Sequence, residues 1–281
     1  MLSKKLSRFT SELSSFGLVN SAISAAAFLL MILFASIRGA DISAATAVMS
    51  VFYAVFTTSS QLFYMNAMAS GRVSAVTFFY SCGFLLPTLA GLFIWKEKIS
   101  PVGALGMVLL IPALRLCASR SDSGDPGRKW VAYALLATLS SGAVGLIQKL
   151  HQSSEHKAEL GGFLLLAMGI SLILSLAIAF VGAGKSTVTS GKNQIRATAG
   201  EIGRAGFVRA VLCGLCLGTA NILNLTLTGI IPAVIFFPVF NGSVVLASTA
   251  LARVICGEKV TKKQALGLLL GLCGIVLIAL K

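Results

Sequence analysis

The sequence predicts an all-α polytopic membrane protein built from two inverted repeats. Apolar residues make up 56% of the 281 residues and charged residues only 11%, with a mean hydropathy of +0.90. A chain of this composition has too little polar surface to cover a water-soluble globule. Uncharged runs long enough to cross a hydrocarbon slab of ~30 Å recur along it, and one hairpin pattern occurs twice.

The repeated hairpin is clearest near the end of the chain. Residues 231–253 form an apolar run that carries no charge before Arg253, and it is followed by a Gly-Glu-Lys turn and by a second, uncharged run over 264–280. The earlier copy has a run over 74–95, the turn Lys96-Glu97-Lys98 and a further run that begins at Pro101. We therefore predict a duplication, with a first repeat over 1–120, a linker over 121–128 and a second repeat over 129–281.

Nine helices are predicted from the runs. The first repeat has four, at about 19–37, 45–69, 73–95 and 101–119, and the second has five, at 130–150, within 160–184, two within 210–252, and at 264–280. Gly229 and Pro232 mark where the long run over 210–252 folds back. Residues 185–209 are too charged to cross a bilayer and are expected to form an extended loop or a surface helix.

An odd number of helices is unusual for a duplication. Gln148-Lys149-Leu150 ends the fifth helix, and the similar Lys4-Lys5-Leu6 precedes the first one. The hypothesis is that one N-terminal helix is missing from a five-plus-five plan, through a misplaced start codon or a genuine loss. Five helices separate equivalent positions, so the repeats are inverted, as in secondary transporters with a binding site near the bilayer midplane.

Topology follows from the basic residues. Most of the 23 Lys and Arg residues lie on the side of the N-terminus, which the positive-inside rule therefore places in the cytoplasm. The opposite side holds Arg38, Lys96, Lys98, Lys149, Lys157 and Lys281.

One set of residues occurs once in each repeat. It comprises Gly71, Ala75, Glu97, Lys98 and Gly106, with the counterparts Gly229, Ala233, Glu258, Lys259 and Gly267. This pattern resembles the drug/metabolite transporter superfamily in its EamA-like branch. The resemblance implies ten helices and export or exchange of small polar metabolites, amino acids or drugs by alternating access. The chain departs from the family in its missing first helix, and in a charge distribution that would place both ends of a ten-helix form outside.

Polar side chains within the runs are candidates for a substrate cavity, because lipid cannot satisfy their hydrogen bonds. They are Gln61, Asn66, Tyr80, Gln148, Asn221, Asn224 and Asn241. Tyr64, Phe78, Phe79, Phe236 and Phe237 could add an aromatic lining. The alternative is that the amides only hold helices together and that the Phe side chains face lipid or the core.

Charged residues offer a second candidate set. Glu97 and Glu258, each beside Lys98 or Lys259, are either gating charges or caps of the helix that follows, and capping is favoured. No carboxylate lies inside a run, so proton antiport on a buried Asp or Glu is unsupported. His151 and His156 are interpreted as solvated loop residues, and no metal or cofactor is predicted.

The predicted function is secondary transport or export of small metabolites or drugs by alternating access, and the predicted location is the plasma membrane, as a prokaryotic inner-membrane protein. The protein is not expected to be an enzyme. Its expected partners are a small solute and membrane lipid, not nucleic acid, and the small face at Gly267 and Gly271 suits contact with another helix or a homodimer. The alternatives are a lipid flippase, a non-transporting membrane subunit and, less favoured, a membrane-embedded enzyme.

Overall fold

The computed structural model describes residues 13–71, 73–117, 129–184, 191–256 and 261–279. These residues form nine helical segments, as predicted, when α4, η1 and α5 are taken as one. Their bounds are α2 Leu13–Arg38, α3 Ala44–Ser70, α4 Val73–Ser81, η1 Cys82–Phe84, α5 Leu85–Phe93, α6 Pro101–Cys117, α7 Lys129–Gln152, α8 Leu160–Gly184, α9 Gly191–Ile230, α10 Ala233–Cys256 and α11 Lys262–Ala279.

Several helices have the length and the apolar composition of membrane spans. Among the residues that the structure describes, four helical stretches are long and apolar enough to span a bilayer by length and composition: Ser15–Arg38, Lys129–Gln152, Leu160–Gly182 and Gly203–Ile230. Many large apolar side chains on these helices point outward, such as Leu29 at 65% exposure and Ile173 at 66%. Outward apolar side chains on long helices are what lipid contact requires. The protein is therefore an all-α polytopic membrane protein.

Two helices differ in detail from the prediction. The single helix expected over 73–95 is interrupted by the 3-10 turn η1, where Leu85 donates to the carbonyls of Cys82 and Gly83. Pro87 has no N–H for the carbonyl four residues earlier, so the chain tightens at this point. Helix α9 starts well before residue 210 and is broken at Gly203, whose φ of 60° is readily adopted only by glycine.

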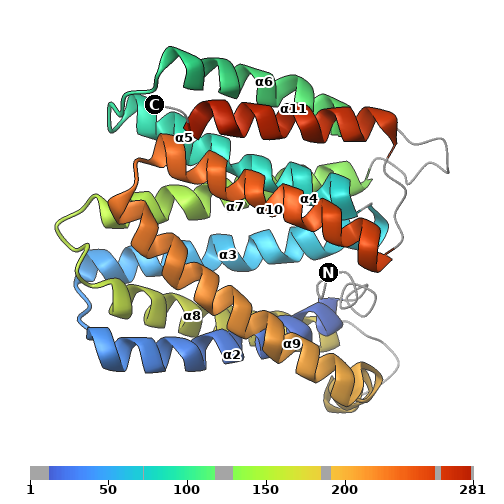
Figure 1. Cartoon of the computed structure of the whole chain (residues 1–281). Helices are drawn as coiled ribbons and strands as arrows, with labels where there is room; N and C mark the ends of the chain where they lie inside the picture. The colour runs from blue at the N-terminus through green and yellow to red at the C-terminus, as the bar shows by residue number, and fades with distance from the viewer. Residues whose placement is uncertain (1–12, 72, 118–128, 185–190, 257–260, 280–281) are drawn as a thin grey trace.

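The helices pair in a pattern that follows the repeats (Figure 1). α6 packs along α11 at one edge of the molecule, and α2 packs along α8 and α9 at the opposite edge. α3, α7, α10 and the α4–η1–α5 segment lie between these edges. α2 packs against α9, and the equivalent pair, α8 and α3, also packs together. α10 packs against both α4 and α5. The α7 helix has no counterpart among the described helices.

The glycine face predicted on the last helix packs against α6 of the same chain. Gly267, Gly271 and Gly274 are buried, and a Cβ on Gly274 would lie 2.8 Å from the carbonyl oxygen of Gly106 on α6. The two helices therefore approach to backbone contact at this position.

Candidate functional site

Five of the seven predicted cavity residues line one central cavity of about 220 Å³: Tyr80, Gln148, Asn221, Asn224 and Asn241. They come from α4, α7, α9 and α10, so both repeats contribute. Gln61 and Asn66 on α3 do not line this cavity, and the Asn66 amide donates to the Leu62 carbonyl of its own helix at 2.8 Å. That the five residues contact a solute stays a prediction.

Small and aromatic residues complete the lining. Gly145 on α7 leaves room for the Phe237 ring, because a Cβ there would lie 3.0 Å from it. Of the predicted aromatic residues, Phe237 lines the cavity, and Phe236 packs edge-on against it with ring centroids 5.2 Å apart. Phe84 and Phe240 also line it, although the sequence analysis did not single them out.

The remaining predicted aromatic residues lie beside the cavity rather than in its lining. Tyr64 packs against Tyr80 with ring centroids 4.7 Å apart, and Phe79 packs edge-on against Trp130. The Phe78 side chain lies outside what the structure describes.

A hydrogen-bond relay behind the cavity joins three helices. The Gln148 amide on α7 donates to the Tyr53 hydroxyl on α3 at 3.3 Å, and that hydroxyl donates to Asn221 Oδ1 on α9 at 3.2 Å. Tyr53 is completely buried. Tyr53 was not among the predicted cavity residues, although its hydroxyl, like their amides, lies inside an apolar run where lipid cannot satisfy it.

Asn224 carries a buried oxygen whose hydrogen-bonding capacity the described residues leave unused. Asn224 Oδ1 is buried and accepts no hydrogen bond from the described residues. Asn221, one helical turn away, is already engaged with Tyr53, and the Asn241 amide donates to the Phe237 carbonyl at 2.9 Å. An unsatisfied buried carbonyl costs about 1–3 kcal/mol, so the Asn224 oxygen is the lining atom most in need of a donor.

Glu97 contacts two helices at one end of the molecule. Its Oε1 lies 2.7 Å from Lys149 Nζ, and both side chains are nearly buried, at 13% and 11% exposure. Its Oε2 accepts the backbone N–H of Val234 at 3.1 Å, in the first turn of α10. Lys149 Nζ also lies 5.9 Å from the centre of the Trp95 ring. Glu97, of the first repeat, thus binds two helices of the second repeat.

This arrangement corrects one sequence interpretation. Glu97 was expected to cap the helix that follows it, but the Ser100 hydroxyl accepts from Gly103 at the start of α6. Glu97 caps α10 instead, where its charge also complements the helix dipole. Lys98 lines the adjoining cavity of about 300 Å³ together with Glu97, Lys149 and residues 229–232. Glu258 and Lys259 lie outside the described residues.

The two histidines differ from each other. His151 was expected to be solvated, but it is completely buried at the end of α7, with its ring centroid 4.3 Å from that of Phe163. His156 lies in the loop before α8, where its Nδ1 is 3.0 Å from Glu159. In the part of the chain that the structure describes, no three His, Cys, Asp or Glu side chains form a group that could hold a metal ion.

Glu159 fastens this loop to α3. Its carboxylate accepts the Ser43 backbone N–H at 2.8 Å. Hydrogen bonding from Thr46 and from the Ser43 backbone lowers the pKa of Glu159 to about 2. Glu159 is therefore ionised at neutral pH and serves as a cap for α3.

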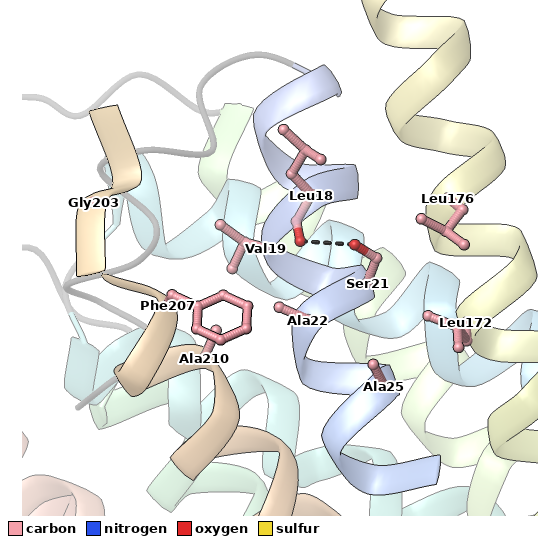
Figure 2. Close-up of a pocket in the computed structure, with 10 residues that line it drawn as sticks. All are labelled: Leu18, Val19, Ser21, Ala22, Ala25, Leu172, Leu176, Gly203, Phe207 and Ala210. Atoms are coloured by element: carbon pink, nitrogen blue, oxygen red, sulfur yellow. Dashed lines mark hydrogen bonds between the residues drawn. The ribbon is translucent and has the colours of Figure 1, made fainter. Parts of the chain in front are cut away.

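A third hollow is larger than the other two but almost wholly apolar (Figure 2). It measures about 330 Å³ and is lined by α2, α8 and α9. The Phe207 ring of α9 lies over Ala22 and Ala210, and Leu172 and Leu176 of α8 form another side. Its one polar side chain, Ser21, bonds to the Leu18 carbonyl of its own helix. With no polar group left to orient a solute, this groove suits lipid chains better than substrate.

Comparison with known proteins agrees with the helical hairpin pattern. The model of the EamA-like transporter family matches residues 128–280, more than half of the chain. One solved crystal structure of a protein is similar in fold, with a TM-score of 0.59 and a sequence identity of 14%. The match covers 99% of this chain and 94% of the other chain. At that identity it shows the fold alone. No curated protein matches the sequence. The chain therefore belongs to the EamA-like transporter family, within the drug/metabolite transporter superfamily, and is a multi-pass membrane transporter of small solutes.

Proposed function

We propose that this protein is a secondary transporter that moves small metabolites or drugs by alternating access to the central cavity. The observation that carries the proposal is the origin of the lining: α4, η1 and α5 come from the first repeat, and α7, α9 and α10 from the second. Movement of one repeat against the other would open such a cavity at either end in turn.

Glu97 is proposed as the gate at one end. Its contacts with Lys149 and with the Val234 N–H hold the first repeat to the second. Opening this end would break the 2.7 Å charge-assisted hydrogen bond between Lys149 and Glu97. It would also leave the Val234 N–H at the start of α10 without its acceptor. Because both side chains are nearly buried, opening must also let water reach the two charges.

The proposed location is the plasma membrane, as a prokaryotic inner-membrane protein, with the Glu97 end facing outward. Support for the orientation comes from the Lys and Arg residues, most of which lie on the side of the N-terminus. The positive-inside rule places that side in the cytoplasm.

Counterflow tests the proposed function, because it needs no coupling ion. Purified protein would be reconstituted into liposomes that contain an excess of one unlabelled solute, and uptake of the same labelled solute would be followed. Amino acids, nucleosides, organic cations and small uncharged aromatic amides form the panel. We expect trans-stimulated uptake of at least one class, reduced by Asn221→Leu in the cavity and unchanged by Thr219→Val, an exposed position on the same helix.

The contrary result has a specific form. Protein that stays folded and monodisperse but shows no counterflow, while it moves fluorescent phospholipid between leaflets, would establish the flippase alternative instead.

A further inference from the structure

We propose that the central cavity accepts an uncharged, ring-sized heteroaromatic solute that donates an N–H hydrogen bond to Asn224. This inference rests on the proposed function, because it names the class of solute that the same cavity would carry. Three independent properties of the cavity support it: its lack of charge, the buried Asn224 oxygen that accepts no hydrogen bond from the described residues, and its aromatic walls and small size.

The lining carries no charge. Its fifteen residues are Tyr80, Gly83, Phe84, Pro87, Ser141, Val144, Gly145, Gln148, Leu217, Ala220, Asn221, Asn224, Phe237, Phe240 and Asn241, and none is acidic, basic or a histidine. Lys149 follows Gln148 in the chain, but its charge is already paired with Glu97 at 2.7 Å. A solute with a net charge would therefore lose its hydration without meeting a counter-charge, which is strongly unfavourable.

The hydrogen bonds of the lining favour a donor. The amide of Gln148 and the oxygen of Asn221 already bond to Tyr53, and the Asn241 amide bonds to its own helix. Asn224 Oδ1 is the lining atom that is buried without a partner among the described residues. A solute with an N–H group directed at this oxygen would remove the cost of leaving it unpaired.

The walls and the volume favour a flat ring. Phe84, Phe237 and Phe240 present apolar ring surfaces, and Tyr80 adds a fourth aromatic side chain. Aromatic side chains bind flat rings by stacking or by edge contacts. The cavity volume of about 220 Å³ lies below the ~300–1,000 Å³ of ordinary small-molecule pockets. One ring with a small substituent fits this space, whereas a nucleoside or a larger drug would require the cavity to expand.

Four compounds on one ring separate these properties. Nicotinamide is uncharged and has N–H donors; N,N-dimethylnicotinamide lacks the donors; nicotinate is an anion; and 1-methylnicotinamide is a cation. Equilibrium binding of labelled nicotinamide to the purified protein in lipid nanodiscs, with displacement by the other three, gives their relative affinities. We expect nicotinamide to bind, the two charged compounds to bind at least roughly tenfold more weakly, and the dimethyl compound roughly tenfold more weakly.

A variant assigns the donor preference to one residue. In Asn224→Leu, nicotinamide and its dimethyl form should bind with nearly equal affinity, because the acceptor is gone. In Thr219→Val, exposed on the same helix, the preference should be unchanged. Both variants would be checked for a single peak in size-exclusion chromatography.

Two results would overturn the inference. The first is tighter binding of nicotinate or 1-methylnicotinamide than of nicotinamide, and the second is no binding of nicotinamide by folded protein. Either result leaves the proposed function standing if counterflow of another solute is positive. Loss of both counterflow and binding would remove the proposed function as well.

Discussion

Tyr53 holds two amide side chains of the cavity wall in place. Tyr53→Phe removes the hydroxyl that accepts from Gln148 and donates to Asn221, so both buried amides lose a partner. We expect a loss of about 1–3 kcal/mol of stability, seen as a melting temperature several degrees lower in detergent. Tyr133→Phe is the matched control, because Tyr133 is 38% exposed on α7. Equal melting temperatures for the two variants would show that the hydrogen bonds of Tyr53 contribute nothing to stability.

Glu159 makes a pH-dependent contribution at the end of α3. Its pKa in the folded protein is about 2, below the ordinary value of 4.5, so its stabilisation is fully present above pH 4.5 and is lost as the pH falls through 2. Glu159→Gln should therefore lower the melting temperature at pH 7, and the difference from the unaltered protein should shrink below pH 4.5. The exposed Glu155, changed to Gln, serves as the control. A difference that grows on acidification would contradict this assignment.

Residue types alone indicated five of the six polar side chains of the cavity lining, since polar side chains inside apolar runs must face protein or water. Residue types did not indicate which side chains contact each other in the folded protein. Glu97 and Lys149 are 52 positions apart, and nothing local showed that they form an ion pair. His151 was misplaced for a related reason: its neighbours in sequence are polar, but Phe163 and Thr46, which cover it, come from other helices.

At the scale of single elements, close backbone contact fixes where α7 meets η1. A Cβ on Gly142 would lie 2.8 Å from the Gly83 carbonyl oxygen, and one on Gly83 would lie 2.7 Å from the Thr138 carbonyl oxygen. Gly142→Leu should push α7 away from η1 and so increase the distance between Tyr80 and Gln148 across the cavity. We expect a sharp loss of monodisperse protein and of counterflow. Ala132→Leu on the exposed face of α7 should be tolerated; equal loss in both would mean that α7 tolerates no added bulk anywhere.

The number and approximate bounds of the helices could be predicted because the length of an apolar run directly reflects the thickness of the bilayer. The interruptions could not be placed as well. Pro87 and Gly203 were visible in the sequence, but proline and glycine also occur inside continuous membrane helices. Whether the backbone breaks there depends on tertiary contacts, so the 3-10 turn and the bend in α9 appear only in the structure.

At the scale of the whole molecule, helix pairing follows the internal duplication. α2 with α8, α6 with α11, and the α4–η1–α5 segment with α10 pair equivalent elements of the two repeats. This arrangement surrounds one cavity with helices from both repeats and brings Glu97 to α10 at one end. A transporter that works by alternating access needs such a gate to close one end while the other is open.

The most direct test of the proposed gate is thiol labelling of the cavity from the Glu97 end. Ala220→Cys, a lining position, would be introduced after replacement of the six native cysteines, with a membrane-impermeant reagent applied from the Glu97 end. The exposed Lys157→Cys, in the loop between α7 and α8, would show that the reagent reaches this end. We predict slow labelling of Ala220→Cys while Glu97 is intact, and labelling several-fold faster once Glu97→Gln or Lys149→Met is added. Rates that do not change in either variant would contradict the account, because the Glu97–Lys149 pair would then not close the cavity.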